Sequence, residues 1–404
     1  MHTPSPVPDR LTGCLMGGAI GDALGAPVEG LGLDQIHERY GPRGLTEYAE
    51  GSYGVGAITD ETQLTLRTAD ALIRASVRER DKGIGGAAVG MVQTAYLGWV
   101  RIHRDGTEPG PSAGTAPAPA PAGGPRAPLA FPDPLDSPRG YGAATVAALR
   151  EAEARKEPGR PLGTVEEPVN NSKGCAAVVR VAPCGFGAGK AEYAFDLAVR
   201  VAALTHGHRT AQLAAGVFAA TVWGLVRDGE IADSLGEARG LLEGRSGHEE
   251  VSRALDAAVE TASRGVPTAW DLAGLGDGWT SEEALAVAAC VALRAEDLAS
   301  PATAPVLEPG YSSHRGIPEV GRYGLRLAVN HSGDSDSIGA LCGSLIGARY
   351  GVHAFPGHWQ SQLEVRERVI GLAADAALEF GPCPPSEPAR EGVHGAWAAA
   401  HSGY

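Results

Sequence analysis

The sequence predicts an all-α protein, a compact bundle of many helices. Apolar residues recur at steps of three and four along most of the chain, and alternation with a period of two is hard to find. Alanine and leucine favour helix, whereas aromatic residues make up only 5% of the chain. Glycine supplies 57 of the 404 residues and lies mostly between the periodic segments, where it serves turns and helix ends. The core must therefore be built from small aliphatic side chains on closely packed helices.

The apolar stripes predict helices, in chain order, over residues 11–18, 64–72, 193–204, 251–259, 338–346 and 365–376. Leu11 and Leu15 lead the first stripe, and the clearest stripe runs from Ile338 to Ile346. Pro27 should end the first helix, because proline cannot continue the helical hydrogen-bond pattern. Glu29 then emerges on a loop.

We expect one domain over residues 1–404, with its core between residues 11 and 378. Residues 106–138 are dominated by Pro, Ala and Gly, so they should form a mobile, partly polyproline-like insertion. The segments on its two sides share the same helical character, which indicates an insertion into one domain. The tail over residues 381–404 is also predicted to be loosely ordered.

Charge and cysteine usage narrow the class of protein. With 34 basic and 48 acidic residues the formal net charge is −14, which argues against general binding to nucleic acid or to an anionic membrane surface. No apolar run is expected to reach the length of a membrane span. Six cysteines stand far apart with no C-x-x-C pair, so we expect reduced thiols and a cytoplasmic protein.

Two acidic clusters precede predicted helices. Thr59, Asp60 and Glu61 come before one helix, and Asp334, Asp336 and Ser337 come before another. Acids and hydroxyls are ordinary helix N-caps, but two carboxylates in three positions exceed what a cap requires. A hard divalent cation would relieve their repulsion, and all-oxygen ligation suits Mg²⁺, Ca²⁺ or Mn²⁺ more than Zn²⁺. If both clusters meet in space, they supply enough ligands for two metal ions.

A polar segment in the middle of the chain is open to two interpretations. Asn171, Ser172, Lys173 and Gly174 precede a predicted helix and could bind phosphate there, but helix capping alone would look similar. His206 follows the helix over 193–204, a position that favours histidine in any case.

Taken together and in order, these segments resemble the ADP-ribosylglycohydrolases. The glycine-rich stretch from Gly21 to Glu29 is similar to the family's first motif, and Thr59 to Thr62 is similar to its T-D-D-T motif. Gly333 to Gly339 is similar to the G-D-x-D-T motif near the C-terminus. The intermediate landmarks of the family resemble residues 172–183, 204–206 and 278–285.

The resemblance implies an all-α fold with a binuclear Mg²⁺ centre in a cleft, with Mn²⁺ as an alternative ion. The metal ligands that it implies are Thr59, Asp60, Glu61, Asp334, Asp336 and Ser337. It implies Glu29, Asp60 and Asp334 as the catalytic carboxylates, with Glu29 the first choice to activate water. It also implies that Asn171, Ser172, Lys173 and Gly174 face the diphosphate or ribose and that His206 lies near the distal ribose.

Two positions depart from the family pattern. Glu61 stands where the family usually has aspartate, and Mg²⁺ tolerates little geometric error. Ser337 replaces threonine but keeps the hydroxyl group.

The function that the resemblance implies is hydrolysis of an N- or O-glycosidic bond, which releases ADP-ribose from a modified protein or small molecule. ADP-ribosyl-arginine protein is the default substrate, and nothing in the sequence indicates a nucleic-acid target or a membrane partner. Two alternatives stay open: another Mg²⁺-dependent hydrolase, acting on a nucleotide or phosphate ester, and a non-catalytic relative that binds ADP-ribose.

Overall fold

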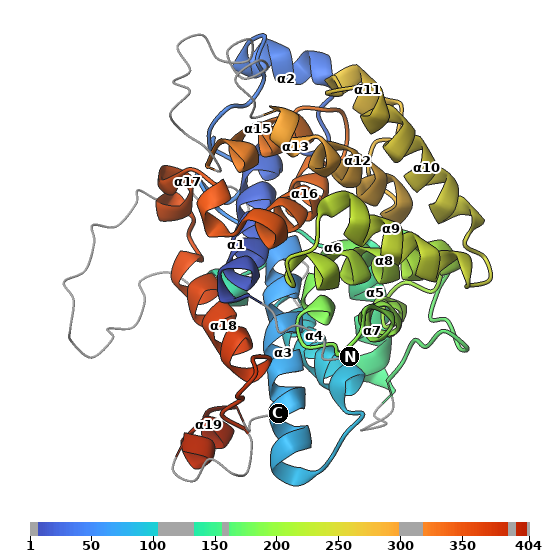
Figure 1. Ribbon diagram of the computed structural model, residues 1–404, viewed down its shortest axis with the longest axis vertical. Helices are drawn as coiled ribbons and strands as arrows, with labels where there is room; N and C mark the ends of the chain where they lie inside the picture. The colour runs from blue at the N-terminus through green and yellow to red at the C-terminus, as the bar shows by residue number, and fades with distance from the viewer. Residues whose placement is uncertain (1–6, 104–132, 156–160, 299–317, 387–392, 402–404) are drawn as a thin grey trace, which may run out of the picture.

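The computed structural model describes residues 7–103, 133–155, 161–298, 318–386 and 393–401. Within these ranges the chain forms α-helices and short 3-10 turns without a single strand (Figure 1), which confirms the predicted all-α class. The longer helices are α1 (Pro8–Gly25), α2 (Leu33–Tyr40), α3 (Asp60–Lys82), α4 (Ala88–Val100), α5 (Ala143–Ala154), α7 (Ala191–Ala203), α8 (Arg209–Leu225), α9 (Ile231–Glu243), α10 (Glu249–Ser263), α12 (Ser281–Leu293), α15 (Pro318–Val329), α16 (Ser335–Tyr350), α18 (Arg366–Glu379) and α19 (Val393–His401). The shorter ones are α6 (Ala176–Val179), α11 (Ala269–Ala273), α13 (Ala295–Leu298) and α17 (Gly357–Gln362).

Each predicted apolar stripe lies on one of these helices. The first stripe belongs to α1 and the clearest one to α16, while α3, α7, α10 and α18 carry the others. Helix α1 ends at Gly25, and a 3-10 turn over Ala26–Val28 contains Pro27 and leads to Glu29. The proline therefore ends the helix as predicted.

Helices α1 and α16 form the centre of the molecule and run antiparallel in very close contact. Glycines at every fourth position of α1, from Gly13 to Gly25, face the glycine-rich side of α16. A Cβ built on Gly13 would lie 2.3 Å from the carbonyl oxygen of Gly347, and one on Gly17 would lie 2.2 Å from that of Gly343. No residue with a side chain fits at such distances, so the two backbones pack directly on each other.

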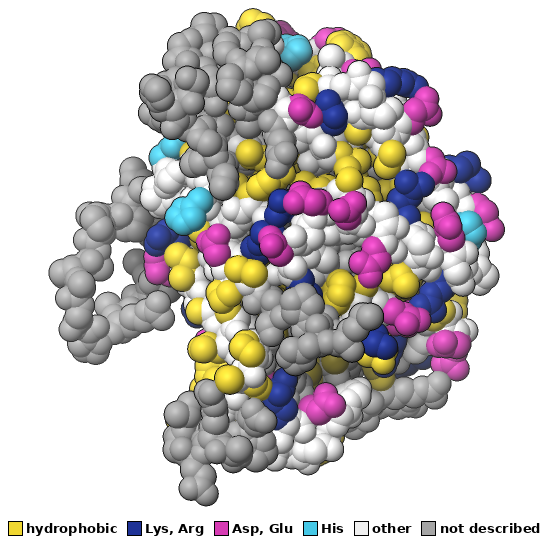
Figure 2. Space-filling model, viewed as in Figure 1, with side chains coloured by type: hydrophobic (Ala, Val, Ile, Leu, Met, Phe, Trp, Pro, Cys, Tyr) yellow, Lys and Arg dark blue, Asp and Glu magenta, His cyan; other side chains and the backbone are white. Residues whose placement is uncertain are grey.

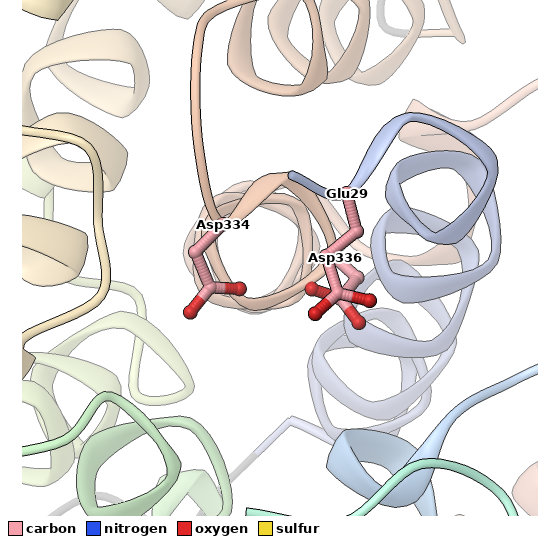
Figure 3. A group of neighbouring side chains, drawn as sticks. All are labelled: Glu29, Asp334 and Asp336. Atoms are coloured by element: carbon pink, nitrogen blue, oxygen red, sulfur yellow. The ribbon is translucent and has the colours of Figure 1, made fainter. Parts of the chain in front are cut away.

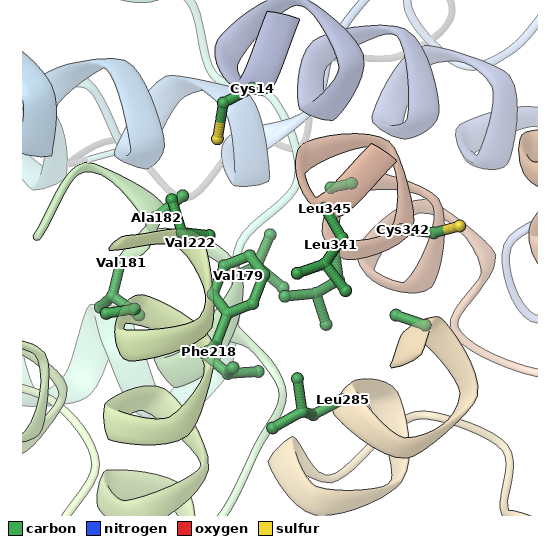
Figure 4. Close-up of a cluster of buried hydrophobic side chains, with 14 of the residues drawn as sticks. Cys14, Val179, Val181, Ala182, Phe218, Val222, Leu285, Leu341, Cys342 and Leu345 are labelled. Carbon is green, nitrogen blue, oxygen red and sulfur yellow. The ribbon is translucent and has the colours of Figure 1, made fainter. Parts of the chain in front are cut away.

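Other helices surround this pair. Helices α15, α12 and α8 pack against α16, and α18 and α3 pack against α1 (Figure 1). Helices α7 and α9 lie against α8, and α10 lies against α12. The buried side chains between α1, α8, α12 and α16 are small or aliphatic, with Phe218 among the few rings (Figure 4). Ten residues of the chain are Tyr and six each are Trp and Phe, so close backbone packing takes the place of large side chains.

Helix α1 corrects one prediction from sequence. The segment Pro8–Val28 is long and apolar enough to cross a membrane by length and composition, with a mean hydropathy of 1.2. However, 83% of that stretch is buried inside the protein, because α16 and α18 cover it. Its apolar character is accounted for by its place in the core.

Parts of the segments predicted to be mobile are held by specific hydrogen bonds. Most of the Pro/Ala-rich stretch lies outside the described residues, but its end forms a 3-10 turn over Pro134–Asp136. The carbonyl oxygens of Pro134 and Ser137 accept hydrogen bonds from Gln63 Nε2 at 2.6 and 2.8 Å. In the predicted loose tail, α19 forms, and its Trp397 donates to the buried carboxylate of Glu379 at 2.9 Å. Both contacts are made with residues outside the segment concerned, Gln63 and Glu379, so composition alone could not predict them.

The charges of the molecule lie mainly on its surface. On the face shown in Figure 2, acidic and basic side chains are interspersed and apolar side chains are scattered among them. All six cysteines are free, as the absence of paired spacings predicted.

Candidate active site

Five segments far apart in the sequence bring predicted site residues to a cavity of about 370 Å³. Glu29 reaches it from the turn after α1, and Thr59, Asp60 and Glu61 reach it from the start of α3. Asp334, Asp336 and Ser337 come from the start of α16, and Ser172, Gly174 and His206 form part of the opposite wall. The close packing of α1 against α16 brings the first and third segments together, because a Cβ at Gly25 would lie 2.4 Å from the backbone of Asp336.

The polar residues at the start of α3 and α16 have a local structural role as well. Thr59 is the N-cap of α3, and its hydroxyl accepts a hydrogen bond from Glu61 N at 3.3 Å. Asp334 is the N-cap of α16 and accepts from Ser337 N at 3.4 Å. Thr59 and Asp334 therefore cap helices, as the structural interpretation of these clusters predicted, and both also line the cavity.

The carboxylates crowd one another. Ligand oxygens of Glu29, Asp334 and Asp336 lie within 4.8 Å of one another (Figure 3). Glu61 is buried beside them, and its Oε1 accepts a hydrogen bond from Ser337 Oγ at 3.2 Å. Glu61 Oε2 is buried and has no hydrogen-bond partner in the described part of the chain. The glutamate at this position thus reaches the cluster despite its additional methylene group.

The close approach of the carboxylates raises the pKa of several of them. The charge of Asp336, followed by burial, raises the pKa of Glu29 to about 8. Burial and then the charge of Asp336 raise the pKa of Asp60 to about 7. Burial, together with neighbouring carboxylates, also raises the pKa of Glu61 and Asp334 well above the ordinary range. Like charges at short range disfavour each other's ionised form.

Asp22 lies beneath the cluster and was not among the predicted site residues. It is fully buried on α1, and its carboxylate accepts hydrogen bonds from Thr59 N at 3.0 Å and Thr62 N at 3.1 Å. Asp22 therefore fixes the start of α3 relative to α1. Its place in the glycine-rich first motif was visible in the sequence, but nothing there distinguished a supporting role from a surface position.

The donor set fits a hard divalent cation. Among the described residues that line the cavity, none is Lys or Arg, so no basic side chain of that lining neutralises the carboxylates. Buried charges are stable when they are paired or coordinate a metal. The unpartnered Glu61 Oε2 and the converging oxygens of Asp334 and Asp336 provide what such an ion binds.

The opposite wall is a loop bound to the start of α12. Ser281 N donates to Lys173 O at 2.9 Å, Ser281 Oγ donates to Gly174 O at 2.7 Å, and Cys175 N donates to Trp279 O at 3.1 Å. These bonds hold Ser172, Gly174 and Cys175 at the cavity. Cys175 Sγ lies 2.7 Å from Asp334 Oδ2, and it joins the two walls.

Two predicted substrate-binding residues are placed differently. Lys173 forms ion pairs with Glu250, at 2.6 Å, and with Glu282, and it does not line the cavity. Asn171 is exposed and does not line it either. The helix that follows is only α6, four residues long, so the loop backbone and not a long helix forms this wall. The spacing in the sequence could not show which side chains of the loop turn outward.

The cavity has a further edge that was not among the predicted site residues. Gly140, Tyr141 and Gly142 line it, together with Tyr53, and Tyr53 Oη accepts a hydrogen bond from Gly140 N. A Cβ at Gly140 would lie 2.7 Å from Asp60 Oδ1, so only glycine allows this approach. A tyrosine between two glycines directly after the Pro/Ala-rich stretch was the available signal.

Comparisons with known proteins identify the family of this chain. The sequence model described as ADP-ribosylglycohydrolase matches residues 3–385. A solved structure titled ADP-ribosylglycohydrolase-related protein complex is similar to 91% of this chain and 97% of its own, with a TM-score of 0.57 and 26% identity. The chain therefore belongs to the ADP-ribosylglycohydrolase family, a family of metal-dependent enzymes that hydrolyse glycosyl bonds and release ADP-ribose.

Two curated relatives match shorter stretches. The ADP-ribosyl-[dinitrogen reductase] glycohydrolase of Rhodospirillum rubrum is 49% identical over 55 residues, which are 13% of this chain and 19% of the relative. An uncharacterized protein of Archaeoglobus fulgidus is 35% identical over 66 residues, 16% of this chain and 22% of the relative. The matched parts thus span about a fifth of the length of these relatives. The family predicted from the sequence motifs is confirmed.

Proposed function

We propose that the protein is a Mg²⁺-dependent hydrolase that cleaves the glycosidic bond between ADP-ribose and a modified target, with ADP-ribosyl-arginine protein as the default substrate. The observation that carries the proposal is the convergence of Glu29, Asp60, Glu61, Asp334 and Asp336 on one cavity that has no described Lys or Arg in its lining. We also propose a cytoplasmic location, in keeping with the six free cysteines.

The residues proposed to hold the metal ions are Thr59, Asp60, Glu61, Asp334, Asp336 and Ser337. Two ions fit the number of oxygens that these residues offer, and Mn²⁺ is the alternative ion. When bound, the ions supply charge that polarises bound water and orients ribose hydroxyl groups. Asp22 does not line the cavity and has a supporting role, since its oxygens are taken by Thr59 and Thr62.

The protein's own groups perform the remaining steps. Glu29 stands on the turn at the rim, where it can orient the attacking water and accept its proton. The carboxylates of Asp60 and Asp334 balance the positive charge that develops at the anomeric carbon. Ser172, Gly174 and His206 offer hydrogen-bonding groups on the opposite wall, where they would bind the ADP-ribose moiety.

The test is release of ADP-ribose from an ADP-ribosyl-arginine protein, assayed with Mg²⁺ and with EDTA. We expect release with Mg²⁺, none with EDTA, and none from Asp336→Ala in either condition. Glu237→Gln, an exposed acid on α9, serves as the matched control and should behave as wild type.

Product analysis separates the alternatives. Release of inorganic phosphate from a nucleotide or phosphate ester, without ADP-ribose, would replace the proposal by another hydrolase. Binding of ADP-ribose without turnover of arginine, serine or small-molecule conjugates would indicate a non-catalytic relative.

A further inference from the structure

A buried arginine lies behind the cavity wall, and the proposed chemistry does not use it. Arg180 is fully buried and stacks on the ring of Tyr96, with its Cζ 4.8 Å from the ring centroid. Its Nη2 donates a hydrogen bond to Thr205 Oγ1, whereas its Nε and Nη1 have no hydrogen-bond partner among the residues that the structure describes. Burying a guanidinium group is costly, and the hydrogen bond that it donates to Thr205 offsets part of this cost.

Thr205 connects this arginine to the cavity. Its Oγ1 lies 2.8 Å from His206 Nδ1, and His206 lines the cavity together with Ser172 and Gly174. The other ring nitrogen points toward that wall, because a Cβ built on Gly174 would lie 3.3 Å from His206 Nε2. A chain of contacts therefore leads from Arg180 through Thr205 to His206 at the cavity.

The hydrogen-bond donors and acceptors of Arg180, Thr205 and His206 determine which ring nitrogen of His206 carries the proton. A guanidinium group only donates, so Thr205 Oγ1 accepts from Arg180. The hydroxyl group then has one proton to donate, and in the described part of the chain only His206 Nδ1 lies in hydrogen-bond reach of Oγ1 as a further partner. Thr205 is fully buried, and a buried hydroxyl that fails to donate costs free energy. Nδ1 is thus the acceptor, and the ring proton sits on Nε2.

We propose that Arg180 and Thr205 are positioning residues that hold His206 as a neutral imidazole with its Nε2–H directed into the cavity. In this form His206 donates one hydrogen bond to an oxygen of the ligand, a hydroxyl or phosphoryl oxygen. This hydrogen bond to the ligand rests on the proposed function, since it assumes that the ADP-ribose moiety occupies this cavity.

Two further observations fit this assignment. Burial, aided by the charge of Arg180, lowers the pKa of His206 to about 3, so the imidazole does not become a cation near neutral pH. The backbone around it is also held in place: Asn170 Nδ2 donates to Thr205 O at 2.8 Å, and Asn170 Oδ1 accepts from Gly207 N at 3.0 Å. The backbone on both sides of His206 is therefore fixed, and Thr205 Oγ1 contacts the ring itself.

The first experiment is ¹⁵N NMR of the histidine rings in ligand-free protein, with the His206 signals assigned by comparison with His206→Gln. We expect a non-protonated Nδ1 and a protonated Nε2 in wild type. Thr205→Val removes the hydroxyl group but keeps the shape, so the Nδ1–H tautomer should gain population. Thr205→Ser restores the hydroxyl group and should restore the wild-type pattern. A protonated Nδ1 in wild type, or an unchanged pattern in Thr205→Val, would overturn the proposal.

Thr221→Val is the matched control. It also removes a buried threonine hydroxyl, one that donates to Val217 O within α8, and it should leave the His206 tautomer unchanged. If Thr205→Val fails to fold, the wild-type and Thr205→Ser spectra still decide the tautomer.

The second experiment measures the dissociation constant of ADP-ribose by calorimetry. We expect Thr205→Val to weaken binding about tenfold, the size of one lost hydrogen bond, while Thr205→Ser and Thr221→Val stay within about twofold of wild type. Equal affinity of Thr205→Val and wild type would contradict the ligand contact. A wild-type protein that shows the expected tautomer but binds no ADP-ribose would support the positioning role and contradict the proposed function.

Discussion

The backbone of Gly21 in α1 lies directly against the backbone of Gly339 in α16. A Cβ on Gly21 would lie 1.9 Å from the carbonyl oxygen of Gly339, and a Cβ on Gly339 would lie 2.3 Å from the carbonyl oxygen of Gly21. Asp22 follows the first glycine, and Asp336 lies one turn before the second. This contact therefore determines both the packing of the core and the geometry of the candidate metal site.

Replacement of Gly21 by alanine should lower the free energy of unfolding by about 3 kcal/mol, because the helices must separate to admit a methyl group. The measurement is urea denaturation. Gly236→Ala is the control: Gly236 lies on α9, a Cβ there would have no atom within 4 Å, and alanine should stabilise by about 1 kcal/mol through helix propensity. Equal effects of the two substitutions would show that the close contact is not needed.

Asp336→Asn should abolish the binding of Mg²⁺ without lowering the stability of the metal-free protein. It removes one negative charge from a buried cluster that contains Glu29, Asp60 and Asp334, so the metal-free variant should melt at the same temperature as wild type or higher. Mg²⁺ should raise the melting temperature of wild type but not that of the variant. A variant that is destabilised in EDTA would argue that Asp336 has a structural partner instead.

The stability of the metal-free protein should fall as pH rises from about 4 to about 7. The raised pKa values of Asp22 and Asp60, both about 7, mean that the folded state binds more protons than the unfolded state in this window. The slope of stability with pH is then negative, about 1.4 kcal/mol per pH unit for each such group. Melting temperatures at several pH values in EDTA test this. Saturating Mg²⁺ should abolish the fall, and a fall of equal size in Mg²⁺ would place its origin outside this cluster.

Glu61→Asp should weaken Mg²⁺ binding about tenfold, although aspartate is usual in the family. A shorter side chain withdraws the carboxylate from Ser337 Oγ, which now lies 3.2 Å from Glu61 Oε1, and Mg²⁺ demands near-ideal ligand positions. Glu61→Gln keeps the length but loses the charge, and it should weaken binding further. Calorimetric titration with Mg²⁺ gives both values. Tighter binding by the aspartate variant would show that the glutamate is a compromise at this site.

Lys173→Met should affect stability more than substrate binding. The ion pairs of Lys173 with Glu250 and Glu282 lie away from the cavity, and their loss leaves Glu282 buried without its cation. We expect a loss of about 2 kcal/mol in the free energy of unfolding and a KM within about twofold of wild type.

Ser172→Ala provides the contrast, because Ser172 lines the cavity and its loss should raise KM with little effect on stability. A large rise in KM for Lys173→Met, without such a rise for Ser172→Ala, would show that Lys173 binds the substrate.

The helices and the order of the chemical motifs could be predicted from the amino-acid sequence. The apolar residues of α1, α3 and α16 could be recognised because a helix in the core must carry apolar side chains wherever it is buried, which for α1 and α16 is nearly their whole length. The acids and hydroxyls at the starts of α3 and α16 were equally visible, because caps and ligands use the same residue types. These features are properties of short segments, so they can be recognised in the sequence without knowing which residues pack against them.

What those residues face depends on the packed fold. The fold brings Glu29, the start of α3 and the start of α16 to one cavity, turns Lys173 toward Glu282 and away from that cavity, and places Arg180 behind Thr205 and His206. Side-chain direction in a loop depends on partners far away in the chain, as in the bonds from Ser281 to the 173–174 backbone. Close approach of α1 and α16 has the same origin: glycine spacing permits the contact, but only the tertiary structure selects the partner.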